Sequence, residues 1–239
     1  MTASGRLLVL RHHDEDHPGL IGEAFVARGF ELDVVMMNEN TPTPSVRGYD
    51  ILLILGSSSA VYDHEVEQAW FGRELGVIAE ARDLHVPVLG ICFGAQALCL
   101  FHGGSVARAP EPEIGWYRID AAPGHEIEAG PWFEFHFDRC TLPDSAELWA
   151  TSPRAVQAFC VGDNVGVQFH PEIDDHQLRD WLESAAESAR DFGHDIDELV
   201  AQTAREVPAA RERAARLVDL FLRHTRRGAF SPERAVELQ

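Results

Sequence analysis

A cysteine at position 92 stands where residue types and spacing indicate nucleophilic chemistry. Glycines lie two residues before and two residues after it, in Gly90-Ile91-Cys92-Phe93-Gly94. An apolar run precedes this stretch and a helical pattern follows, so we expect a strained strand-to-helix turn on which larger flanking side chains would clash. Free N–H groups and the dipole at a helix start lower a thiol pKa. The pattern predicts Cys92 as a nucleophile and the Phe93 N–H as an oxyanion donor. A buried structural cysteine is the alternative.

A second stretch ends in a histidine with a carboxylate close behind it. Residues 164–169 form an apolar, strand-like segment, and His170 and Glu172 follow. Residues i and i+2 of an extended chain point the same way, so Glu172 is expected to fix the imidazole tautomer. His170 would then exchange a proton with Cys92. The alternative is a strand-end histidine beside a solvated glutamate.

Together the two stretches resemble the class I, triad-type glutamine amidotransferase family. The segments GICFGAQ and VQFHPE are close to the signature stretches of this family. The segment Glu113-Ile114-Gly115-Trp116 is also similar to its stand-alone members, and the chain resembles the glutaminase domain of GMP synthase. The resemblance implies a flavodoxin-like fold and a catalytic triad of Cys92, His170 and Glu172.

The resemblance implies an oxyanion loop after another apolar strand. The family has a Gly-Gly-Pro-type loop here, whereas this chain has Gly56-Ser57-Ser58. The N–H of Gly56 or Ser57 is expected to complete the oxyanion hole with that of Phe93. Ser58 is expected to contact substrate. A serine-rich surface turn is the alternative, and the loop's departure from the family pattern raises the question of what orders it.

Two further residues are expected at the substrate. Gln96 follows Cys92 by four positions and so lies on nearly the same helix face, where its amide can bond a glutamine substrate as the matching family residue does. His136 shares a predicted strand face with Asp138, and the family has a histidine near its site here. The alternative for His136 is a half-exposed histidine in an aromatic strand.

Composition narrows the class of protein. The chain has 239 residues and a formal net charge of −19, which argues against nucleic-acid and anionic-membrane partners. No apolar run has the length of a membrane span, and the first residues do not form a signal peptide. The four cysteines include no C-x-x-C pair, which predicts a cytoplasmic location.

We expect no metal and no organic cofactor. Residues 11–17 contain three histidines and three acidic residues, but their spacing fits no standard metal site. The chain contains neither a P-loop motif nor a G-x-G-x-x-G stretch for a nucleotide. A complete ammonia-using synthetase is therefore not encoded here.

Alternating patterns of strand and helix predict an α/β fold with a doubly wound, mostly parallel sheet. We expect buried strands at 6–10, 31–36, 49–55 and 86–89, with helices at 20–28 and 65–82. Short strands between 109 and 150 predict an antiparallel flap, and residues 155–169 predict a hairpin that leads to His170.

The pattern changes after Glu172. Apolar spacing predicts helices at 178–190, 196–206 and 209–224, so we divide the chain into an amidotransferase domain at 5–190 and a C-terminal helical extension at 191–239. Six arginines of the extension cluster in an otherwise acidic chain: Arg211, Arg213, Arg216, Arg223, Arg226 and Arg227. They predict a solvated helix face, with a docking surface for an acidic partner as the alternative.

Three functions fit these patterns. The first is a glutaminase whose ammonia goes to a separate synthetase subunit, and the second is a stand-alone γ-glutamyl hydrolase or peptidase. The third is a non-catalytic or redox-sensing module. A histidine directed at a thiol has no purpose in the third, and we favour glutamine hydrolysis coupled to a partner over the second.

Overall fold

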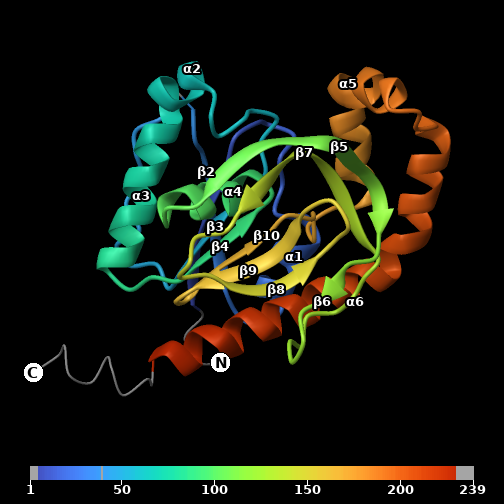
Figure 1. Ribbon diagram of the computed structural model, residues 1–239. Coiled ribbons are helices and arrows are strands. Elements are labelled where there is room, and N and C mark those ends of the chain that lie inside the picture. The colour runs from blue at the N-terminus through green and yellow to red at the C-terminus, as the bar shows by residue number, and fades with distance from the viewer. Residues whose placement is uncertain (1–4, 39, 230–239) are drawn as a thin grey trace, which may run out of the picture.

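The core of the molecule is one eight-stranded sheet (Figure 1). The computed structural model describes residues 5–38 and 40–229, with side chains up to residue 225. In spatial order the strands are β2 (Glu31–Met36), β1 (Arg6–Arg11), β3 (Ile51–Ile54), β4 (Val88–Ile91), β10 (Asn164–Val167), β9 (Val156–Val161), β8 (Glu147–Thr151) and β6 (Asp120–Ala121).

The first five strands in that order run parallel, and β9, β8 and β6 extend the sheet in antiparallel pairing. This arrangement confirms the flavodoxin-like, mostly parallel sheet predicted from the sequence. Chain order reverses between β1 and β3, because β1 lies between β2 and β3. In such sheets, ligands bind beyond the carboxyl ends of the strands at the reversal. The loops that follow β1, β3, β4 and β10 meet at this edge.

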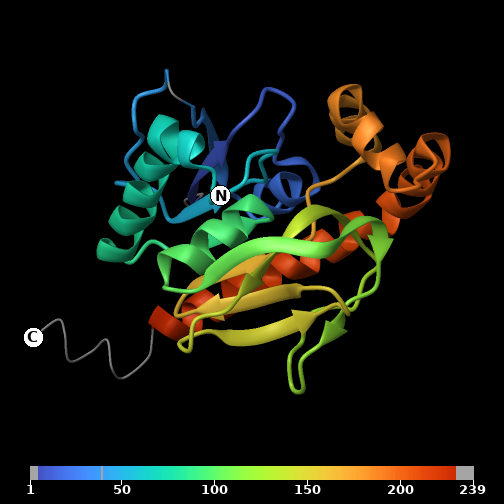
Figure 2. The same cartoon turned by 45° about the horizontal axis from the view of Figure 1, so that its top comes forward.

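Helices cover both faces of the sheet (Figure 2). They are α1 (Gly19–Val26), α2 (His64–Val66), the π-helix η1 (Glu67–Phe71), α3 (Gly72–Asp83), α4 (Phe93–Phe101), α5 (Asp175–Asp191) and α6 (Ile196–Ala229). Alternate side chains of β1 enter different cores: Leu7 packs with residues of α1 and α6, whereas Leu8 packs with residues of α3 and α4. A strand buried on both faces needs an apolar residue at nearly every position, as β1 has.

The flap is a separate two-stranded antiparallel sheet of β5 (Ser105–Tyr117) and β7 (Trp132–Thr141). Ile114 and Phe133 of this sheet pack with Leu178 and Leu182 of α5. Figure 1 shows the two long strands curving over the sheet toward α5. The expected flap therefore forms, although two strands of the predicted region, β6 and β8, join the main sheet instead.

The C-terminal region differs from expectation. The helices predicted at 196–206 and 209–224 are a single helix, α6, with Pro208 inside it. An interior proline removes one helix hydrogen bond and costs about 3 kcal/mol, which is why the sequence predicted a break. Burial on both sides of Pro208 offsets that cost, because Leu199 and Phe221 are both in hydrophobic cores. The division of the chain at residue 190 stays a prediction.

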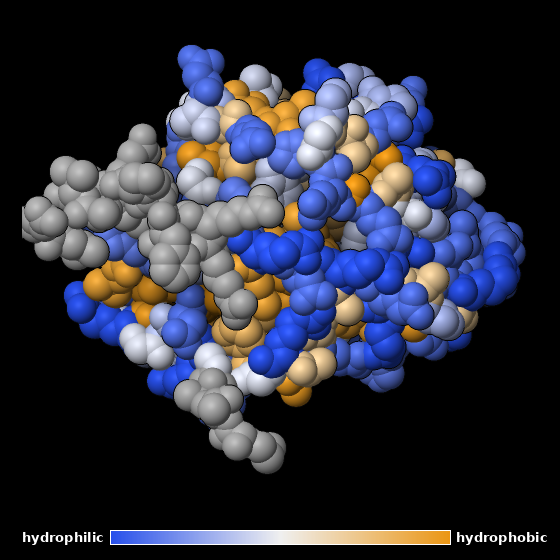
Figure 3. Space-filling model, turned by 90° about the horizontal axis from the view of Figure 1, so that it is seen from below, coloured by the Kyte–Doolittle hydropathy of each residue, from blue (hydrophilic) through white to orange (hydrophobic). Residues whose placement is uncertain are grey.

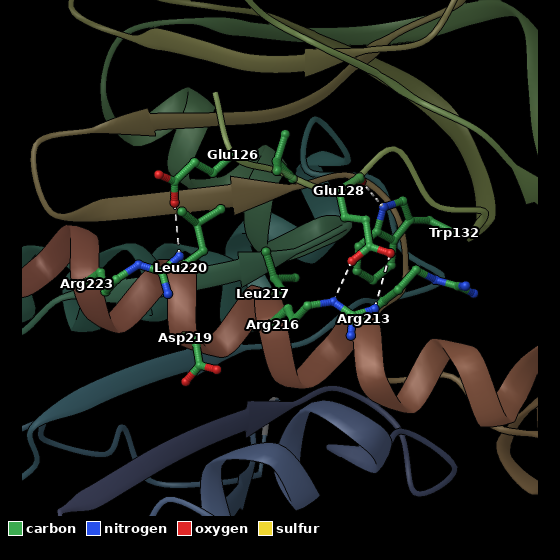
Figure 4. A pocket seen from close by; sticks show the side chains of 10 residues that line it. Glu126, Glu128, Trp132, Arg213, Arg216, Leu217, Asp219, Leu220 and Arg223 are labelled. Carbon is green, nitrogen blue, oxygen red and sulfur yellow. Dashed lines mark hydrogen bonds and ion pairs between the residues drawn. The ribbon is translucent and has the colours of Figure 1, made fainter. Parts of the chain in front are cut away.

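Arg211, Arg216 and Arg223 are about half exposed, as the predicted solvated face requires, and Arg213 is the exception. Arg213 has a side chain only 5% exposed, with its guanidinium over the rings of Trp116 and Trp132. Figure 4 shows Arg216 and Arg223 directed at two acidic residues, Glu128 (2.7 Å) and Glu126 (3.1 Å). These arginines attach α6 to its own chain, in addition to the ion pair of Arg211 with Glu23. The side chains of Arg226 and Arg227 lie outside the described residues.

Seen from below the view of Figure 1, the surface of the molecule mixes hydrophilic and hydrophobic residues (Figure 3). Large exposed apolar side chains are few among the described residues, and Val26 at 57% is the most exposed of them. None of the described helices is both long and apolar enough to cross a membrane.

Candidate active site

Cys92 stands at the turn between β4 and α4 with a backbone that side chains other than glycine rarely adopt. Its φ is 50° and its ψ is −101°. A Cβ at Gly90 would lie 2.4 Å from the carbonyl oxygen of Gly94, and one at Gly94 would lie 2.4 Å from that of Ile54. The close approach of strand, turn and helix therefore requires both glycines. Strain of this kind concentrates at functional sites.

The strand beside β4, β10, places His170 next to Cys92. The Cys92 N–H donates to the carbonyl of Val167 at the end of β10 (2.8 Å), and His170 follows three residues later. The His170 N–H in turn donates to the Phe133 carbonyl of the flap (2.7 Å). Two backbone bonds thus hold the imidazole between the sheet and the flap.

His170 and Glu172 form a buried pair. Nδ1 of His170 lies 2.7 Å from Oε1 of Glu172, and the side chains are 4% and 1% exposed. Burial lowers the pKa of His170, but the charges of Glu172 and Cys92 and its hydrogen bonds to both outweigh burial and raise that pKa well above its usual value. The raised pKa favours an imidazolium beside the sulfur.

Cys92 and His170 line a pocket, and the serine loop after β3, residues 56–59, forms another wall of it. Gly56 faces the site closely, because a Cβ there would lie 3.1 Å from Cε1 of His170 and 3.7 Å from Cβ of Cys92. Ser57 and Ser58 also line the pocket. The Ser57 hydroxyl accepts from the Ser59 N–H (3.1 Å), as in a serine-stabilised turn.

Of the other sequence-predicted residues, Gln96 and His136 line this pocket, whereas the side chain of Phe93 does not. Gln96 lines it and donates through Nε2 to Oε1 of Gln168 (3.2 Å). His136 also lines it and shares a buried strand face with Asp138, so it is not the half-exposed histidine of the alternative. Phe93 begins α4, where the first N–H groups have no helical partner.

His136 is held by two carboxylates that the sequence did not connect to it. Its Nε2 lies 3.2 Å from Oε2 of Glu113 and 3.3 Å from Oε2 of Glu134. Burial lowers the pKa of His136, but hydrogen bonds to Glu113 and Glu134 outweigh burial and raise it to about 10. At neutral pH His136 is therefore an imidazolium that is paired with these two carboxylates. The Glu113-Ile114-Gly115-Trp116 segment was the signal in the sequence for Glu113. The sequence did not show that Glu113 pairs with His136, because the two residues lie in different strands, β5 and β7.

Aromatic side chains complete the pocket, which has a volume of about 490 Å³. Phe135 and Phe137 come from the flap, and Trp181 comes from α5. The Trp181 ring meets the His170 ring nearly edge-on, with centroids 4.9 Å apart, and its indole N–H has no hydrogen-bond partner. Sequence reasoning missed this wall, since apolar residues on a strand or a helix usually indicate core.

The polar loop after β1 lies at the rim, where Asp16 and His13 line the pocket. Nε2 of His13 lies 3.0 Å from the Ser58 hydroxyl, and Asp16 accepts from the His13 N–H (3.0 Å). Within residues 5–38 and 40–229, no group of three or more His, Cys, Asp or Glu side chains is arranged to hold a metal ion.

A mostly parallel sheet of this order thus carries a cysteine on a strained turn with a buried histidine–carboxylate pair beside it. Residues 19–183 match the family glutamine amidotransferase class-I. The chain belongs to that family.

Curated relatives and solved structures agree with this assignment. The chain is 37% identical over 103 residues to the GMP synthase [glutamine-hydrolyzing] of Brucella melitensis biotype 1. The match covers 38% of this chain but only 20% of that protein, so the chain matches about a fifth of the length of this relative. The same holds for GMP synthase [glutamine-hydrolyzing] from Brucella ovis.

Two solved structures share the fold over nearly the whole chain. A glutamine amidotransferase from Thermotoga maritima superimposes with a TM-score of 0.82 at 24% identity, covering 92% of this chain and 99% of that one. A glutamine amidotransferase from Methylobacillus flagellatus gives a TM-score of 0.81 at 22% identity, covering 93% and 96%. Neither match leaves more than a tenth of this chain uncovered.

Proposed function

We propose that this protein hydrolyses the γ-carboxamide of glutamine through a thioester on Cys92 and releases ammonia. The observation that carries the proposal is the strained Cys92 turn beside the buried His170–Glu172 pair, in one pocket with the Gly56-Ser57 loop. A structural cysteine needs neither the strained backbone nor a carboxylate-oriented imidazole.

The proposed reaction begins when the Cys92 thiolate attacks the γ-carbonyl carbon. The N–H groups of Phe93 and of Gly56 or Ser57 stabilise the oxyanion. The His170 imidazolium gives its proton to the departing amide nitrogen, which leaves as ammonia. His170 then takes a proton from water as the water attacks the thioester, and glutamate leaves as the Cys92 thiolate and the His170 imidazolium are restored. Glu172 keeps the imidazole oriented and stabilises its charge in both steps.

Three residues are proposed to hold the rest of the substrate. His136 is proposed to contact the substrate through its ring, because Nδ1 lies 3.0 Å from the Asp138 carbonyl oxygen and Nε2 lies between two glutamates. Gln96 and Ser58 offer an amide and a hydroxyl from other sides of the pocket. No organic cofactor or metal takes part in these steps.

The ammonia is proposed to go to a separate synthetase subunit. The support is the similarity to proteins named GMP synthase. We propose a cytoplasmic setting, because all four cysteines are free thiols. Neither a nucleic acid nor a membrane is proposed as a partner of a chain with a net charge of −19.

A second candidate, hydrolysis of γ-glutamyl amides larger than glutamine, is favoured by the size of the pocket. A volume of about 490 Å³ falls among pockets that hold drug-sized ligands, at about 300–1,000 Å³. The wall of Trp181, Phe135 and Phe137 adjoins His170, where the leaving amine departs. An apolar amine would fit that wall better than ammonia does.

The two candidates separate in one assay on the isolated protein. Release of ammonia from glutamine is compared with release of the amine from γ-glutamyl peptides and γ-glutamyl anilides. The glutaminase proposal predicts a slow turnover of glutamine, below the ~10 s⁻¹ typical of enzymes, that rises when a synthetase partner binds. Rapid cleavage of a γ-glutamyl peptide, with glutamine a poor substrate, would instead select the second candidate.

A further inference from the structure

A buried ion pair behind the serine loop has no part in the reaction described so far. Nε2 of His12, just after β1, lies 2.8 Å from Oε2 of Glu74 in the first turn of α3. The two side chains are 1% and 0% exposed. The second oxygen of Glu74 has no hydrogen-bond partner, which makes the pair expensive to bury. Buried ion pairs often add little to the stability of the folded state, so the role of this pair follows from the other contacts of His12.

The other nitrogen of His12 holds the backbone of the serine loop. Nδ1 lies 2.7 Å from the carbonyl oxygen of Gly56. A carbonyl oxygen only accepts, so Nδ1 must carry the proton and donate it. Burial lowers the pKa of His12, but the charge of Glu74 and the hydrogen bond to it raise it overall, which favours a donor at both nitrogens. The rings of Trp70 and Phe93 lie 4.7 and 5.0 Å away and leave the imidazole little freedom to turn.

The direction of the Gly56 carbonyl fixes the direction of the next N–H. The Gly56–Ser57 peptide bond is trans, and the carbonyl and N–H of a trans peptide point in opposite directions. The carbonyl points at His12, which does not line the pocket, whereas Gly56, Ser57 and Cys92 do. The Ser57 N–H is therefore turned away from His12 and toward the pocket side of the loop.

We propose that His12 and Glu74 are positioning residues for the oxyanion hole. Glu74 fixes the imidazole, the imidazole fixes the Gly56 carbonyl, and the Ser57 N–H is thereby presented to the oxyanion that forms at Cys92. The inference rests on the proposed thioester chemistry. It also answers what orders a loop in which Ser57 and Ser58 stand where the family has glycine and proline, since the anchor lies within this chain.

The test replaces both members of the pair by apolar side chains. Exchange of a whole buried ion pair for hydrophobic residues is often neutral for stability, so the double variant His12→Leu/Glu74→Leu is expected to fold. It lacks the donor to Gly56. Loss of one oxyanion-hole donor costs about 10²–10³-fold in kcat, and we expect a loss of roughly 10²-fold for glutamine, or for the γ-glutamyl amide that the wild type cleaves. KM is expected to stay within about threefold, because ground-state contacts are unchanged.

A second readout separates positioning from general damage. Iodoacetamide alkylates a thiolate without forming an oxyanion, so its rate with Cys92 is expected to match the wild type in the double variant. The variant His12→Asn retains a donor near the Nδ1 position and is expected to recover most of the lost kcat. Thr203→Val, which removes the bond of a buried hydroxyl to Trp116 (2.8 Å), serves as a control that is expected to keep full kcat.

The outcomes distinguish this inference from the proposed function. A wild type that cleaves neither glutamine nor any γ-glutamyl amide overturns the proposed function itself. An active wild type with a double variant of nearly equal kcat overturns only the positioning role. Equal losses of kcat and of alkylation rate also overturn it, because they indicate a disturbed Cys92. If the double variant does not fold, failure of the folded His12→Asn variant to exceed a folded His12→Ala variant in kcat overturns it as well.

Discussion

At position 170 an imidazole lies between a carboxylate and a thiol. The imidazole and the carboxylate are proposed to have separate roles. Glu172 contacts Nδ1 at 2.7 Å and keeps the ring oriented, whereas the ring itself is proposed to carry the proton. Removing the ring and neutralising the carboxylate should therefore have different consequences.

We expect His170→Ala to lower kcat by at least the 10²–10⁴-fold that general acid–base catalysis contributes. Glu172→Gln should keep weak activity, because a neutral amide orients the imidazole but does not stabilise its charged form. Steady-state kinetics of the two variants, with folding checked by circular dichroism, make the comparison. A Glu172→Gln enzyme with nearly full kcat would show that the orienting carboxylate is elsewhere.

A second prediction at this scale concerns the charge of His136. Its pKa of about 10 is above the ordinary value near 6.5, so the folded state holds a proton that the unfolded state loses between these two values. The stability from this group is complete below about pH 6.5 and is lost as the pH rises through about 10. In Glu113→Gln one of the two carboxylates is gone, and the pKa should fall.

Histidine-selective NMR across the alkaline range measures this directly. The His136 resonance of the wild type should still be that of an imidazolium at pH 8, and its midpoint should move downward in Glu113→Gln. A wild-type midpoint near 6.5 would contradict the prediction that the two glutamates hold His136 as an imidazolium.

At the scale of elements, the turn between β4 and α4 depends on space that only glycine leaves. A methyl group at Gly94 would lie 2.4 Å from the Ile54 carbonyl oxygen, so Gly94→Ala must displace β3 or α4. We expect it to lower both the free energy of unfolding and kcat. Gly76→Ala is the matched control, since nothing lies within 4 Å of its added methyl group and α3 gains about 0.5–1 kcal/mol. Urea unfolding and glutamine turnover of both variants test this, and equal behaviour of the two would contradict it.

The long helix α6 is expected to stabilise the sheet through its buried face. Phe221 is fully buried against α1, where it meets Phe25 edge-on at 6.3 Å. Phe221→Ala should cost about 3–5 kcal/mol of unfolding free energy. Arg223→Ala removes an exposed ion pair on the same helix and should cost about 1 kcal/mol or less. A cost below about 1 kcal/mol for Phe221→Ala would indicate that α6 is an appendage.

These elements show why the sequence predicted some features and missed others. The parallel strands and the Cys92 turn have local signals, because apolar runs and spaced glycines are properties of neighbouring residues. The continuity of α6 through Pro208 has no local signal, since burial far along the chain offsets the cost of the proline. The pair of His12 and Glu74 joins residues 62 positions apart, and only the packing of α3 beside β1 brings them together.

At the scale of the whole molecule, four separate loops meet at the carboxyl edge of the sheet and form the site. Those loops follow β1, β3, β4 and β10, and the flap and α5 complete the pocket with Phe135 and Trp181. The sheet supplies rigidity, and the loops supply the chemistry. The family assignment is shown by the match over residues 19–183, whereas the substrate and the acceptor of ammonia are proposals.

The central claim is that Cys92 carries a γ-glutamyl group during turnover. The most direct measurement is an acid quench of the enzyme while it hydrolyses glutamine, followed by mass spectrometry of the peptide that contains Cys92. The account predicts a mass increase of one γ-glutamyl group on Cys92, lost on treatment with hydroxylamine and missing from the inactive Cys92→Ala variant. Steady turnover of glutamine by the Cys92→Ala variant, or a γ-glutamyl group found only on another cysteine, would contradict the account.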